Sequence, residues 1–225
     1  MNPQHHLDQA TLVNYAAGAL SSSMSVVVAT HLMGCAVCRS QLAVAEGIGG
    51  ALMAAQRPDA TEPPTRLREA MLAKLDRPTA PKARSVAIKG TSEAPPVDPD
   101  SLPRPLQRYF GCSWNMLRWR WVAPGVHMIR ADRPREDTLI LLKIAPGKSM
   151  PMHSHGGSEL TQILQGSYDD KLGHFAPGDV ADLDSDVEHQ PITAPGVPCV
   201  CVAALDAPLR FQGWLARKLQ PLVGL

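Results

Sequence analysis

The sequence predicts two domains of different fold class, a small all-α helical bundle followed by an all-β barrel. Apolar residues in the first quarter recur with helical spacing, whereas after residue 118 short apolar runs alternate with Pro-Gly turns. Between these parts, residues 57–105 hold ten of the 21 prolines, and proline interrupts both helices and central strands. We therefore expect a helical domain over 1–80, a proline-rich linker over 81–105 and a barrel over 106–225.

Four helices are expected in the first domain. Asp8 is a suitable N-cap for the first helix, with Leu7 and Leu12 placed to pack together across the cap. The serines at 21–23 should begin a second helix that ends near Gly34. A third helix should run from residue 35 or 38 to about 55, and a short fourth helix at 65–75 is bounded by prolines.

Short strands separated by Gly/Pro turns are expected in the second domain, a pattern typical of a β-sandwich or barrel. The expected strands cover residues 119–122, 126–129, 138–144, 160–164, 180–183 and 199–203. A short closing helix is expected at 214–222.

Composition and charge exclude several classes of protein. With 22 basic and 21 acidic residues the net charge is +1, which argues against attachment to nucleic acid or an anionic membrane by bulk charge. No apolar run approaches the roughly 18 residues that cross a bilayer, and the sequence does not open with a signal peptide. Five cysteines, an odd number, do not suggest a secreted disulfide framework. We therefore expect a cytoplasmic protein.

A first cluster of metal-binding side chains has the spacing H-x3-C-x2-C, formed by His31, Cys35 and Cys38. A turn or helix junction brings such side chains together, and structural zinc takes four ligands of this kind. The fourth ligand should come from His5 or His6, which precede the first helix; we choose His6, although spacing does not separate the two. The sequence thus predicts a zinc site of His6, His31, Cys35 and Cys38.

Two other interpretations of this cysteine pair remain open. It can be a redox pair, although such pairs usually follow a strand in a βαβ unit, which is not expected here. Both cysteines can instead be buried core residues, a common position for free cysteine.

The helical domain is poor in charge, with only Asp8, Arg39 and Glu46 in residues 1–56. So few charges cannot cover a small domain, and an exposed apolar surface usually marks a protein partner. The alternative is that this surface packs on the C-terminal domain. One arginine and no lysine in this stretch also disfavour direct nucleic-acid binding.

A second cluster lies in segment 147–166, which reads G-x5-H-x-H-x3-E-x6-G. His153 and His155 alternate along extended chain and should face one side of a sheet, and Glu159 should return from the next strand. His189, after a Pro-Gly-Asp turn, can supply a third imidazole. Three histidines and a glutamate suit zinc, iron, manganese, nickel or copper, and the sequence does not choose among them.

These residues resemble the first metal motif of the cupin superfamily, small β-barrels, at every position. The second cupin motif is matched only in part. Gly178 and His189 fit it, whereas Asp184, Asp186 and Thr193 stand where the family has Pro, Gly and Asn. The resemblance covers about residues 106–215 and implies a second transition metal in the barrel, with zinc as the first candidate.

The two motifs together resemble ChrR-type anti-sigma factors, which belong to the zinc-binding anti-sigma proteins. Further matches are NYAAG at 14–18 and VATHL at 28–32. The resemblance implies that the helical domain binds and inhibits a group IV (extracytoplasmic-function, ECF) sigma factor in a 1:1 complex. It also implies release of that sigma factor in response to singlet oxygen or related oxidants, sensed through the cupin-like domain. No enzymatic activity, direct nucleic-acid contact or membrane attachment is implied.

Four apolar residues of the helical domain are candidates for the sigma contact: Leu12, Val27, Leu42 and Met71. An alternative from another class is a metal-dependent cupin enzyme, dioxygenase-like, with a zinc-stabilised helical docking domain. A barrel metal with open coordination positions and a substrate pocket would favour the enzyme. Four protein ligands that fill the site would favour the sensor.

Overall fold

The computed structural model describes residues 3–56, 65–75, 98–132 and 137–211. Its compact units do not follow the order of the chain: Met1–Gly49 and Pro99–Leu225 form one unit, and Gly50–Asp98 form the other. Most of the expected linker at 81–105 and all of the expected closing helix at 214–222 lie outside the described residues. The domain boundaries drawn from the sequence therefore stay predictions.

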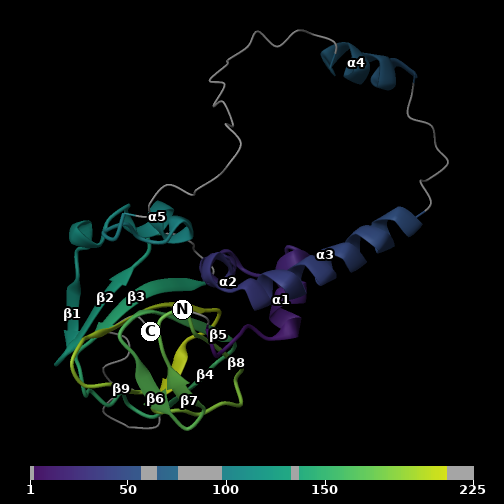
Figure 1. Cartoon of the computed structure of the whole chain (residues 1–225). Coiled ribbons are helices and arrows are strands. Elements are labelled where there is room, and N and C mark those ends of the chain that lie inside the picture. The colour runs from purple at the N-terminus through teal and green to yellow at the C-terminus, as the bar shows by residue number, and fades with distance from the viewer. Residues whose placement is uncertain (1–2, 57–64, 76–97, 133–136, 212–225) are drawn as a thin grey trace. The chain divides into compact units, whose positions relative to one another are not determined.

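The four helices expected near the N-terminus are all present (Figure 1). They are α1 (Gln9–Ala16), α2 (Ser22–Gly34), α3 (Ala36–Ala55) and α4 (Thr65–Leu75). The Asp8 carboxylate caps α1 by accepting a hydrogen bond from the Ala10 N–H, as its position before the apolar stripe predicts. A fifth helix, α5 (Arg104–Phe110), was not expected and leads through a short 3-10 turn into the barrel.

The second part of the chain is built from short antiparallel strands. They are β1 (Arg120–Ala123), β2 (Val126–Arg130), β3 (Thr138–Ile144), β4 (His153–His155), β5 (Glu159–Gln165), β6 (Tyr168–Asp170), β7 (Gly173–Phe175), β8 (Val180–Leu183), β9 (Ile192–Thr193), β10 (Cys199–Leu205) and β11 (Leu209–Phe211). All six expected strands are confirmed. Of the strands of two or three residues, β4 matches the extended chain expected at His153 and His155. The others were missed because so few residues show no clear alternation.

Three sheets make up the barrel. The largest has the order β1-β2-β3-β10-β5-β8, a second has the order β7-β6-β9, and β11 pairs with β4. The central strand β10 is buried along its whole length, because it is covered on both faces. Its Val202 and Ala204 lie among side chains of the N-terminal helices, whereas Cys199 and Cys201 lie on the other face beside Tyr168.

Helix α2 packs on the face of this sheet that carries Val202 (Figure 1). Val27 and Val28 of α2 share one buried cluster with Leu141 of β3 and Leu160 of β5. Burying such aliphatic side chains contributes about 1.5–3 kcal/mol each. Packing against the barrel, considered above as an alternative to a partner-facing surface, therefore describes α2.

This packing corrects two of the expected sigma contacts. Leu12 is 1% exposed and Val27 is 0% exposed, so the expectation that these two side chains face a partner is wrong. Leu42 packs partly against the same cluster. Met71 on α4 is 62% exposed, and its contact with a sigma factor stays a prediction, as does that of Leu42.

Among the described residues, no single helix is both long enough and apolar enough to cross a bilayer. Helices α2 and α3 meet that condition only as a pair, and they are bent by 119° at the break between them.

Candidate metal centres

The first candidate centre lies where α2 meets α3. His31 occupies the last turn of α2, Cys35 follows the helix in an extended conformation, and Cys38 lies in the first turn of α3. The break at Cys35 lets both sulfur atoms face the same side, and the Cys38 backbone N–H donates to Cys35 Sγ. His6 reaches the cluster from the segment before α1. The helix junction thus gathers His31, Cys35 and Cys38, and the segment before α1 adds a residue 32 positions from Cys38.

The ligand atoms of this cluster lie at separations close to those of a tetrahedral zinc site. His6 Nδ1 lies 3.2 Å from Cys35 Sγ and 3.7 Å from Cys38 Sγ, and His31 Nε2 lies 3.3 Å from Cys38 Sγ. All four ligand atoms lie within 4.8 Å of one another. Zn–N bonds of about 2.1 Å and Zn–S bonds of about 2.3 Å imply ligand separations of about 3.4–3.8 Å in a tetrahedron. The donor set and its geometry therefore fit zinc.

Burial shifts the pKa of two members of this cluster, His31 and Cys38. It lowers the pKa of His31 against the opposing hydrogen bond to the Gly178 carbonyl, so the imidazole is neutral and available as a ligand. Burial also raises the pKa of Cys38 to about 11, so a metal must displace its proton. The raised pKa of Cys38 is the opposite of the lowered pKa that makes a thiol reactive.

The structure brings His6, and not His5, to the cluster. The His5 ring stacks on Phe175 with the ring centroids 4.0 Å apart, and its Nε2 atom lies 3.1 Å from the His174 carbonyl oxygen. The geometry agrees with the choice of His6, which spacing alone did not separate from His5.

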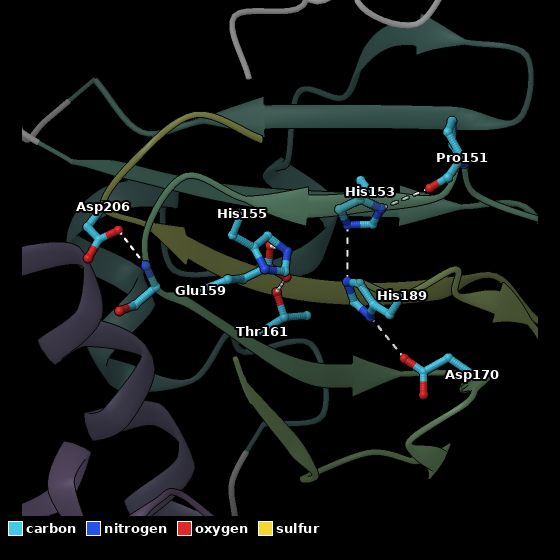
Figure 2. A network of polar contacts seen from close by, with 9 residues as sticks. Pro151, His153, His155, Glu159, Thr161, Asp170, His189 and Asp206 are labelled. Atoms are coloured by element: carbon cyan, nitrogen blue, oxygen red, sulfur yellow. Dashed lines mark hydrogen bonds and ion pairs between the residues drawn. The ribbon is translucent and has the colours of Figure 1, made fainter. Parts of the chain in front are cut away.

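The second candidate centre lies inside the barrel (Figure 2). His153 and His155 stand at the two ends of β4, and His189 lies opposite His153, joined to it by two backbone hydrogen bonds. Ligand atoms of the three imidazoles lie within 4.8 Å of one another, and all three side chains are buried. The alternation expected along β4 does place its two histidines together.

Glu159 stands beside only one of these histidines. It begins β5, and its Oε2 atom lies 2.9 Å from His155 Nε2, while Oε1 accepts a hydrogen bond from the Thr161 hydroxyl. The carboxylate is not part of the mutual group of three imidazoles. Burial opposes its charge, but the hydrogen bond and charge of His155 hold the pKa of Glu159 well below its usual range. It is therefore an anionic neighbour of the three histidines.

Two imidazoles of this cluster face each other through their Nε2 atoms, 3.1 Å apart. Because the Pro151 carbonyl can only accept, His153 Nδ1 must donate to it and its Nε2 is left as a lone pair. His189 Nδ1 faces Asp170 Oδ2 at 2.9 Å, so its Nε2 is also an acceptor in the neutral ring. Two facing lone pairs are relieved by a proton or by a cation, and the residues therefore fit a metal.

Asp170 is a residue of the candidate site that the sequence analysis missed. It lies at the end of β6 and orients His189, as carboxylates behind metal-bound histidines commonly do. Nothing in its local sequence distinguishes it from the neighbouring Asp169, which instead pairs with the exposed His174.

The final glycine of the predicted motif also has a structural reason. Gly166 has φ of 66°, and an added Cβ would collide with the Pro198 carbonyl oxygen of the chain before β10. The turn after β5 thus needs glycine to return the chain beside the metal cluster.

Known proteins resemble this chain along its full length. A family profile of the ChrR cupin-like domain matches residues 107–207. The anti-sigma-E factor ChrR of Cereibacter sphaeroides is 37% identical over 221 residues, which cover 98% of both chains. The chain belongs to the ChrR family. A crystal structure of Rhodobacter sphaeroides SigE in complex with the anti-sigma ChrR matches 92% of this chain and 100% of that one, with 34% identity and a TM-score of 0.72.

The two candidate centres are placed differently with respect to the ChrR-family matches. The barrel histidines lie inside the matched cupin-like domain at 107–207. The His/Cys cluster precedes that domain and falls within the full-length match to ChrR.

Proposed function

We propose that this protein is an anti-sigma factor that binds and inhibits a group IV (ECF) sigma factor in a 1:1 complex. The observation that carries the proposal is the full-length likeness to ChrR, a protein solved in complex with SigE. The proposal places the protein in the cytoplasm, where sigma factors meet RNA polymerase. It assigns no enzymatic reaction to the barrel.

Exposed apolar side chains on α3 and α4 support a protein partner. In α4, Leu67, Met71 and Leu75 recur every four residues, and Leu75 is 80% exposed. No residue of α4 is buried. In α3, Val44 and Ile48 are exposed with the same spacing. Helices with such stripes usually bury them against another surface.

The helical centre is assigned to zinc in this proposal. Zinc held by His6, His31, Cys35 and Cys38 would fix the angle between α2 and α3 and so orient the exposed side of α3 for the sigma factor. Two thiolates and two imidazoles suit zinc better than a hard cation.

The barrel centre is assigned to sensing. His153, His155 and His189, with Glu159 beside them, would hold a second transition metal, for which zinc is the first candidate. Singlet oxygen or a related oxidant acting at the barrel would lead to release of the sigma factor.

The experiment that tests the proposal captures the tagged full chain from its own cells and identifies bound proteins by mass spectrometry. We expect a group IV sigma factor with the wild type, and we expect it to be lost with Met71→Asp/Leu75→Asp. Val197→Asp is the matched control, because Val197 is an exposed apolar residue of a barrel turn, 61% exposed. Recovery of no sigma factor with the wild type would overturn the anti-sigma function.

A transcription assay then separates binding from inhibition. Purified wild-type chain should block transcription by RNA polymerase that carries the captured sigma factor, and illumination with a photosensitiser should relieve the block. A bound sigma factor that remains active would contradict inhibition. A block that persists under illumination would contradict the assignment of the oxidant response.

A further inference from the structure

The turn between β7 and β8 of the barrel, Ala176–Asp179, contacts the helical metal centre from outside. The Gly178 carbonyl oxygen lies 3.0 Å from His31 Nδ1. A carbonyl only accepts, so His31 carries its hydrogen on Nδ1 and presents the Nε2 lone pair to the cluster, 3.3 Å from Cys38 Sγ. This is the tautomer that a metal bound through Nε2 requires.

Glycine allows the turn to make this contact. Gly178 has φ of 99°, a conformation that residues with a Cβ rarely adopt, and it precedes Asp179. The Gly178 N–H is bonded to the Ile163 carbonyl of β5, so the orientation of the turn is set by the barrel.

Asp179 of the same turn binds the backbone of the segment that precedes His6. It is 2% exposed, and its Oδ1 atom accepts hydrogen bonds from the backbone N–H groups of Gln4 and His5. Its Oδ2 atom accepts from the Ala176 N–H, which fixes the carboxylate within the turn.

His5 completes this attachment. Its ring stacks on Phe175, and its carbonyl accepts from the Val180 N–H. With His5 held on the barrel, the next residue, His6, is directed to Cys35 Sγ at 3.2 Å. Two of the four ligands, His6 and His31, are therefore oriented by one barrel turn.

We propose that Asp179, together with the Gly178 carbonyl, is a positioning residue for the helical metal centre: the barrel supplies outer-shell contacts to a site whose four ligands all precede residue 39. This inference rests on the proposed metal binding by His6, His31, Cys35 and Cys38. It adds a means of regulation, because displacement of the β7–β8 turn removes support from both histidine ligands.

The test measures metal binding to the full chain with Co²⁺, whose sulfur-to-metal absorption bands report only a centre that contains thiolates. Zn²⁺ competition against the Co²⁺-loaded chain then gives the relative zinc affinity. In Asp179→Asn the neutral amide replaces the carboxylate at nearly unchanged volume. We expect the affinity of the thiolate centre to fall about 10- to 100-fold, with altered cobalt bands.

Asp182→Asn is the matched control. Asp182 lies on β8 and accepts from the Asp8 N–H at 3.0 Å, so it also joins barrel to helices but does not adjoin a ligand. We expect its cobalt bands and zinc affinity to match those of the wild type. Equal losses in both variants would overturn the positioning role and indicate general loosening.

A second variant, His5→Ala, covers the case in which Asp179→Asn disturbs the barrel itself. It removes the stacking on Phe175 from the N-terminal side and leaves every barrel residue in place. We expect a smaller loss of affinity in the same direction. Wild-type affinity in both Asp179→Asn and His5→Ala, with the barrel folded by circular dichroism, would overturn the inference.

The same experiment distinguishes this failure from failure of the metal assignment. Absence of thiolate bands in the Co²⁺-loaded wild type would overturn the proposed helical centre, and the inference with it. Thiolate bands that are present in the wild type and unchanged by the variants would overturn the inference alone.

Discussion

The helical and barrel clusters both gather imidazoles that could bind a metal, but they do so with different local structures. The helical centre uses a chain break at Cys35 and mixes two sulfur atoms with two imidazoles. The barrel centre uses the alternation of β4 and gathers three imidazoles with a carboxylate to one side. The first donor set offers the four ligands of a tetrahedral site, whereas the second offers three imidazoles.

The comparison also shows what the two centres share. Asp170 at the end of β6 contacts His189 of the barrel centre, and the turn after β7 contacts His31 of the helical centre. Strands β6 and β7 are paired through Tyr168 and Phe175, whose rings also stack. One hairpin thus adjoins both centres, which a division of the chain into two independent domains would not suggest.

The largest effect should follow removal of the helical ligands. Structural zinc contributes on the order of 10 kcal/mol to the site that it organises, so Cys35→Ala/Cys38→Ala should lose this metal and the sigma factor while the barrel metal stays. Metal analysis by mass spectrometry and sigma capture check this. Cys112→Ala, at an exposed cysteine, should change neither. Retained sigma binding in the double variant would contradict the structural role of the metal.

His189→Ala should destabilise the protein less than loss of the helical ligands does, but it should abolish the response to singlet oxygen. Loss of an outer-shell partner typically lowers metal affinity about 10- to 100-fold. Removal of one of the three imidazoles should lower the affinity of the barrel for its metal by more than that. The helical metal and sigma inhibition should be retained, and release by singlet oxygen should be lost. Metal analysis measures the occupancy of each centre, and release of the sigma factor under illumination with a photosensitiser measures the response. An unchanged response would move sensing away from the barrel.

Asp170→Asn should act on the barrel centre alone and less strongly. It keeps the shape of the side chain but weakens its hold on His189, so barrel metal affinity should fall about 10- to 100-fold. Metal titration of the full chain measures this, and Asp169→Asn, which removes an exposed pair with His174, should have no effect. A loss of the helical metal instead would break the comparison between the two centres.

The smallest effect should follow Asp137→Ala. The buried Asp137 carboxylate accepts from the Ser23 N–H at 2.7 Å and so caps α2 from the barrel side. Loss of such a cap costs about 0.5–2 kcal/mol of unfolding free energy, measured by chemical denaturation. Asp132→Ala, at an exposed residue that also precedes β3, should leave the unfolding free energy unchanged. Equal losses would show that the cap adds nothing.

Local patterns were sufficient for the elements and for most of the candidate site residues. The caps at Asp8 and Ser21 and the apolar runs of β3 and β10 act over a few residues, so they can be recognised without the fold. The metal-binding spacings are similarly local. His31, Cys35 and Cys38 lie within about two helical turns, and His153 and His155 within one short strand.

Contacts between distant segments could not be derived in this way. The choice of His6 over His5 depends on Phe175 and Asp179, which are more than 160 residues away in the chain. The burial of Val27 likewise depends on strands that lie far along the chain, since an apolar helix face looks the same whether a partner or its own barrel covers it.

By itself, the sequence determined the two classes of fold, the principal elements and the two clusters of metal-binding side chains, because each depends on residue type and short spacing. Only the tertiary structure decided which histidine joins the thiols, that Glu159 stands beside the barrel histidines, and that α2 packs on the barrel. The physical reason is that burial, hydrogen-bond partners and ligand separations are properties of segments brought together by folding.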